Sequence, residues 1–116
     1  MTKRVVDKLV RDKILAQMQE QGKKVTFKLL TDPAEQKQKI IEKFGEKYKE
    51  LFEALIRTGG DNDKVVDGIA DMIEILNTMT KVRGIPVATL MAKKQEKLTQ
   101  KGGYDTMTYI QYIEEE

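Results

Sequence analysis

Two long stretches with the periodicity of an α-helix, joined by a short polar turn, constrain the fold of this chain most. They cover about residues 33–57 and 63–83, and the turn TGGDND between them makes the two helices antiparallel neighbours. Asp32 can cap the first of these helices, and Pro33 suits its first position. The second stretch has the wide apolar stripe expected of a buried helix or a dimer interface. The apolar positions are Ile40, Ile41, Phe44, Tyr48, Leu51, Phe52 and Leu55 in the first stretch, and Val65, Val66, Ile69, Met72, Ile73, Leu76 and Met79 in the second.

Shorter elements flank this hairpin. Apolar spacing predicts a helix over about residues 7–21, and Gly22 is a plausible stop for it. Gly84 and Pro86 mark the start of a fourth helix, which runs to about residue 101 and ends at Gly102 and Gly103. Alternation of apolar and polar residues predicts a strand over 24–30, and the Thr-, Tyr- and Ile-rich tail 104–113 favours a second strand that pairs with it. The prediction is a mainly all-α bundle of about four helices with a small two-stranded β element.

Composition narrows the possible chemistry. The 116 residues suit one domain, residues 1–116, and 21 basic against 19 acidic residues are too balanced to favour nucleic-acid binding. The chain has no cysteine and no histidine, which excludes disulfides, thiol catalysis, histidine bases and most zinc sites. Any metal would therefore be a hard ion such as Mg²⁺ or Mn²⁺, held by oxygen atoms.

The sequence also bears on location. No apolar run approaches the roughly 18 residues that cross a bilayer, so no membrane partner is expected. The basic start of the chain lacks the long apolar stretch and cleavage site of a secretory signal. The default expectation is a cytoplasmic protein.

Each of the two long helices carries three acidic residues at spacings i, i+4 and i+7, which place them on one helical face. If both triplets faced the seam, the repulsion between their carboxylates would require cations. Exposed acidic faces are common, so a solvated surface is the alternative. Two acids of the second triplet, however, interrupt an apolar run, where a structural helix rarely places them. The triplets are Glu46, Glu50 and Glu53, and Asp67, Asp71 and Glu74.

Two glycines lie beside these triplets. Gly45 and Gly68 each interrupt a helix interior, at a cost of about 1 kcal/mol relative to alanine. They are either tolerated glycines or positions where a side chain is removed to admit a ligand.

Three segments, DKLVRDKI, ADMIEIL and EKLTQKGGY, together resemble one subgroup of the MazG-like superfamily. These are all-α nucleoside triphosphate pyrophosphohydrolases related to phosphoribosyl-ATP pyrophosphohydrolase. The resemblance covers nearly the whole chain in order. It implies a helical bundle, a dimer or higher oligomer such as a tetramer, and Mg²⁺-dependent cleavage of an NTP to NMP and pyrophosphate, with metals clamping the phosphates.

The resemblance also implies where metal ligands belong. The family pairs E-x-x-E on one helix with E-x-x-D on the next, and these map to Lys47 and Glu50, and to Gly68 and Asp71. Two of the four expected ligands are replaced. Lys47 could pair with Glu50 or Asp71 and replace a cation electrostatically, but an ammonium group cannot activate water as Mg²⁺ does. Rescue of an active metal site would draw on nearby carboxylates, namely Glu46, Asp67 and Glu74.

Further nucleotide contacts are expected elsewhere. Lys94, Lys97 and Lys101 share one face of the fourth helix, before a KGGY segment that resembles the family's KRGGF; the alternative is a solvated basic face. Tyr104 could stack on a base or belong to a core. Arg11 is either a phosphate contact or a partner of Asp12 or another acid.

Three functions are consistent with these patterns. The first is a MazG-like protein that binds or sequesters a nucleotide or nucleotide-derived signal without hydrolysis and without a cofactor, such as a phage-encoded sponge acting in the host cytoplasm. The second is an active Mg²⁺-dependent pyrophosphohydrolase with a house-cleaning role, using the displaced carboxylates. The third is a protein–protein interaction module that retains only the fold. The loss of two ligands favours the first, a protein that is not an enzyme.

Overall fold

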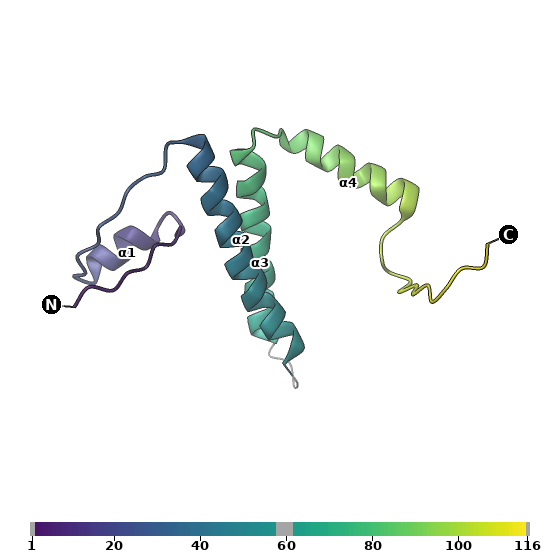
Figure 1. Ribbon diagram of the computed structural model, residues 1–116, viewed down its shortest axis with the longest axis horizontal. Helices are drawn as coiled ribbons and strands as arrows, with labels where there is room; N and C mark the ends of the chain where they lie inside the picture. The colour runs from purple at the N-terminus through teal and green to yellow at the C-terminus, as the bar shows by residue number, and fades with distance from the viewer. Residues whose placement is uncertain (1, 58–61, 116) are drawn as a thin grey trace. The chain divides into compact units, whose positions relative to one another are not determined.

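The computed structural model describes residues 2–57 and 62–115, which form four helices (Figure 1). Their bounds are α1 Ile14–Glu20, α2 Pro33–Ile56, α3 Asn62–Val82 and α4 Val87–Lys101. The predicted all-α class is therefore confirmed.

The predicted two-stranded β element is wrong for the residues that the structure describes. Neither 24–30 nor 104–113 forms a strand there, although each has suitable residues. A strand needs a paired neighbour, and an isolated two-stranded ribbon is marginal in water, so local propensity alone does not produce one. The tail also contains a turn, in which the Met107 N–H donates to the Tyr104 carbonyl at 3.0 Å.

The first helix is shorter than the predicted 7–21, because α1 begins only at Ile14. Asp7 has a φ of 46°, in the left-handed region, which an α-helix cannot accommodate. Residues 7–13 lie outside the helix. At the other end the predicted stop at Gly22 fits its φ of 81°, a conformation that glycine adopts without strain.

The start of α2 follows from its sequence as predicted. The Asp32 side chain accepts a hydrogen bond from the backbone N–H of Glu35 at 3.3 Å, and Pro33 occupies the first helical position. Proline has no backbone N–H, and at the first helical position this costs no hydrogen bond, because an N–H there has no partner within the helix. The predicted end of this helix near Arg57 agrees with its last residue, Ile56.

Helices α2 and α3 pack side by side as a hairpin (Figure 1). Among the described residues, only Ile40 of α2 and Ile75 of α3 are buried hydrophobic side chains. Gly68 of α3 faces Leu51 of α2 so closely that a Cβ atom on Gly68 would lie 2.9 Å from Leu51 Cδ1. This close approach defines the seam of the hairpin.

The chain divides into two compact units, residues 1–84 and 85–116. The second unit holds α4 and the tail, and α4 ends where the Gly102 N–H donates to the Leu98 carbonyl at 3.0 Å. The single domain over 1–116 stays a prediction. No helix in the described part of the chain is both long enough and apolar enough to pass through a bilayer.

Candidate functional site

The two acidic triplets lie on the same side of the hairpin. Glu50 directly precedes the seam residue Leu51, and in α3 Asp67 and Glu74 precede Gly68 and Ile75. Successive residues of an α-helix are rotated by about 100°, so a residue that directly precedes a seam position lies to one side of the seam. Because α2 and α3 are antiparallel, residues that precede seam positions lie on the same side of the pair in both helices. We call this side the charged face; it comprises Lys43, Glu46, Lys47, Glu50, Glu53, Asp67, Asp71 and Glu74.

Lys47 lies at the centre of the charged face. Its Nζ is 3.2 Å from the Glu50 carboxylate on its own helix and 3.6 Å from the Asp71 carboxylate across the seam. Burial by itself would lower the pKa of Lys47, but the hydrogen bond to Glu50 and the charges of Glu50, Asp71 and Glu46 outweigh it and raise the pKa. The ammonium group thus carries a fixed positive charge between two carboxylates that the resemblance assigns to a metal.

Arg11, from the segment before α1, provides a second cation. Its Nη2 donates to Asp71 Oδ1 at 2.6 Å. That hydrogen bond, with the charges of Asp71, Glu74 and Asp67, raises the pKa of Arg11. Burial would raise the pKa of Asp71, but Arg11 and Lys47 together hold it below its ordinary value. The acidic partner of Arg11 in the structure is therefore Asp71 and not Asp12.

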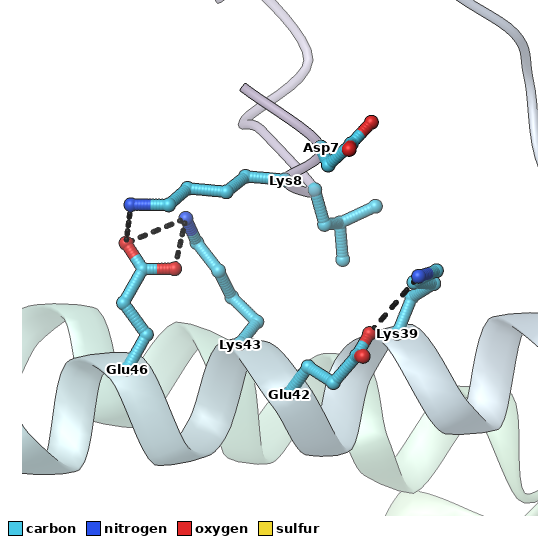
Figure 2. A pocket seen from close by; sticks show the side chains of 7 residues that line it. Asp7, Lys8, Lys39, Glu42, Lys43 and Glu46 are labelled. Atoms are coloured by element: carbon cyan, nitrogen blue, oxygen red, sulfur yellow. Dashed lines mark hydrogen bonds and ion pairs between the residues drawn. The ribbon is translucent and has the colours of Figure 1, made fainter. Parts of the chain in front are cut away.

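Glu46 is the third carboxylate of the site with cationic partners. It lies 3.3 Å from Lys43 Nζ and 3.5 Å from Lys8 Nζ, and Figure 2 shows both lysines reaching toward it. Burial would raise the pKa of Glu46, but the hydrogen bonds and charges of Lys43 and Lys8 lower it. These side chains border a small pocket of about 240 Å³, lined by Asp7, Lys8, Leu9, Lys39, Glu42, Lys43 and Glu46 (Figure 2).

The donor set of the charged face does not fit a divalent metal. No group of three or more acidic side chains in residues 2–57 and 62–115 is arranged to hold an ion. Glu50 and Asp71 are both ion-paired with Lys47, and Glu46 is paired with two other lysines. Asp67 and Glu74, the other candidates for rescue, act on Arg11 through their charges.

The two glycines beside the triplets have different surroundings. Gly68 faces the seam, where Leu51 fills the space that a side chain would need. Its absence of a side chain therefore serves the close packing of α2 against α3. A Cβ atom added to Gly45 would meet nothing within 4 Å, so this position opens onto free space. Neither glycine borders the small pocket.

The remaining nucleotide contacts predicted from sequence belong to the second unit. Lys94, Lys97 and Lys101 are exposed along α4 at spacings that share one face, and Tyr104 is 90% exposed in the tail. Their contact with a nucleotide stays a prediction.

Sequence reasoning missed Lys8 and Lys43. Lys43 could have been found, because it precedes Glu46 by three residues on a helix and such pairs meet. Nothing in the local sequence signals Lys8, since 38 residues separate it from Glu46.

Neither protein-family models, nor curated proteins, nor solved structures gave a match to this chain.

Proposed function

We propose that the charged face binds a nucleotide or nucleotide-derived phosphate compound without hydrolysing it. One observation carries the proposal: Lys47 lies between Glu50 and Asp71, where the family resemblance would put a metal ion. A protein cation there supplies positive charge for phosphate but no metal-bound water, so binding is retained without the means of hydrolysis.

The charged face retains donors for a phosphate group. Arg11 contacts Asp71 through Nη2, while its side chain is 59% exposed and its guanidinium group has five N–H donors in a planar fork. Lys8 and Lys43 add ammonium groups beside the pocket. The ion pairs of exposed side chains contribute little to stability, so a multiply charged phosphate can compete for these cations.

The test is calorimetric titration with nucleoside triphosphates, cyclic oligonucleotides and ADP-ribose derivatives, with and without Mg²⁺, alongside an assay of pyrophosphate release. We expect binding without Mg²⁺ and no release. Mg²⁺-dependent release of pyrophosphate would instead show that the protein is an active pyrophosphohydrolase. If none of these ligands binds, the protein–protein interaction module is the remaining function.

Variants locate the site. We expect Arg11→Gln and Lys47→Gln each to weaken binding roughly tenfold, the loss of about one charge-assisted hydrogen bond. Lys28→Gln is the matched control, since it removes one lysine charge from an ion pair with Glu35 at the start of α2. Equal affinity in all three variants would place the ligand elsewhere, and the lysines of α4 would be tested next.

A further inference from the structure

Residues 7–11 contact the charged face, and we call them the strap. They form neither helix nor strand, and among the residues that the structure describes no backbone hydrogen bond connects them to the hairpin. Their polar contacts are made by two side chains. Lys8 Nζ lies 3.5 Å from the Glu46 carboxylate, and Arg11 Nη2 lies 2.6 Å from Asp71 Oδ1. Ion pairs between exposed side chains are individually weak, so the strap is held loosely.

The two contacts of the strap have the same composition. In each, one carboxylate of the hairpin accepts one cation of the strap and one lysine of α2, and Figure 2 shows this arrangement around Glu46. The strap therefore supplies half of the cations at both places. The two sets are Lys8, Lys43 and Glu46, and Arg11, Lys47 and Asp71.

Without the strap, the hairpin is a poor surface for phosphate. The charged face has six carboxylates and two lysines, a net charge of −4, which repels an anion. With the strap in place, Glu46 has two cationic partners. The cations around Asp71 then equal the carboxylates, since Glu50 is the second carboxylate there. A phosphate compound thus finds a favourable charge only when the strap is docked.

We infer that the strap closes over the phosphate ligand, so that docking of the strap and binding of the ligand strengthen each other. The inference rests on the proposed function. A phosphate group that contacts one cation of the strap and one lysine of α2 joins the two elements and offsets the repulsion between their positive charges. Because linkage is reciprocal, a ligand that binds the docked form better must also hold the strap docked.

Trypsin can measure how often the strap is open, because the rate of cleavage follows the population of the open form when opening and closing are fast. The bond after Lys8 lies in the strap. The bond after Arg4 is a matched reference outside it, since each bond joins a basic residue to an apolar one, and Val5 is 80% exposed. Mass spectrometry of the full chain, early in digestion with a trace of trypsin, gives the ratio of cleavage after Lys8 to cleavage after Arg4.

ATP without Mg²⁺, at constant ionic strength, should lower this ratio at least about fivefold at saturation. Salt at about 1 M should raise the ratio, because it screens the ion pairs that hold the strap. A ratio that ATP leaves unchanged or raises would overturn the inference, and so would a ratio that does not respond to salt.

Calorimetry on the same samples separates the two proposals. If ATP binds but the ratio stays the same, the inference fails and the proposed function stands. If neither ATP nor the other nucleotides bind, the proposed function fails, and the inference fails with it.

Asp71→Asn tests whether the strap opens as a unit. It removes the partner of Arg11 and leaves the ion pair of Lys8, yet cleavage after Lys8 should rise about two- to fivefold relative to the reference bond. Glu35→Gln is the control, because it removes one carboxylate from an ion pair with Lys28, which does not involve the strap. Equal ratios in the two variants would overturn the inference. If Asp71→Asn fails to fold, the ATP and salt measurements on the wild type still decide.

Discussion

Leu51 and Gly68 set the distance between α2 and α3. A Cβ on Gly68 would lie 2.9 Å from Leu51 Cδ1 and 3.3 Å from Leu51 Cβ, so any side chain at Gly68 would force Leu51 to shift. The same approach brings Asp71 within 3.6 Å of Lys47, since Asp71 is one helical turn from Gly68 and Lys47 one turn from Leu51. The contact of Leu51 with Gly68 thus bears both on the packing of the two helices and on the distance between Lys47 and Asp71.

We expect Gly68→Ala to destabilise the hairpin by about 1 kcal/mol. Overpacking costs about 1–3 kcal/mol, and the better helix propensity of alanine offsets about 1 kcal/mol of it. Urea unfolding measures the change. In a Leu51→Ala background, where space is available, Gly68→Ala should become neutral or stabilising. If Gly68→Ala lowers the free energy of unfolding equally in both backgrounds, the contact with Leu51 is not what makes the alanine unfavourable.

We expect Lys47→Glu to make stability depend on Mg²⁺. The variant places a third carboxylate beside Glu50 and Asp71, whose mutual repulsion lowers stability until a divalent ion binds. Thermal unfolding in Mg²⁺ at about 100 times its dissociation constant should recover about 2.7 kcal/mol. Lys47→Gln, which removes the cation without adding a carboxylate, should not respond. A wild type that responds as strongly as Lys47→Glu would support the active alternative. A double variant, Lys47→Glu with Gly68→Glu, would also place a side chain where Leu51 already lies. The single variant is therefore the cleaner test.

We expect the Arg11–Asp71 pair to weaken in acid. The pKa of Asp71 is lower in the folded chain than the roughly 3.9 of an unfolded aspartate. The contribution of the carboxylate to stability is therefore complete above that unfolded value and is lost as the pH falls through the lower, folded pKa. The difference in melting temperature between wild type and Asp71→Asn should be greatest near neutral pH and shrink below about pH 4. A difference that is constant with pH would mean that the ionised form contributes nothing.

We expect Asp32→Ala to destabilise α2 by about 1 kcal/mol, the usual cost of losing an N-cap. The backbone N–H of Glu35 then loses the acceptor that lies 3.3 Å away. Asp32→Asn keeps an acceptor and should cost less than half as much, by urea unfolding. Equal losses in the two variants would show that charge, rather than capping, stabilises this end of α2.

The sequence predicts the hairpin well, because long periodic stretches, a capping aspartate and a short turn all agree. It also brings Lys47 near Glu50, since three residues separate neighbours on a helix. It does not predict the contact of Arg11 with Asp71, because that contact depends on how a non-helical segment crosses the charged face. The strands expected over 24–30 and 104–113 rest on local propensity, which says nothing of whether a pairing partner is in place.

The Arg11–Asp71 hydrogen bond joins residues that are 60 positions apart, whereas α2 and α3 are neighbours in the chain. Contacts between neighbouring elements close short loops and form early in folding, while distant contacts must first overcome a larger loss of chain entropy. We therefore expect the hairpin to form first and the N-terminal segment to dock afterwards. Lys47 would then neutralise Glu50 and Asp71 from the start, so the carboxylates of the charged face are never brought together without a cation.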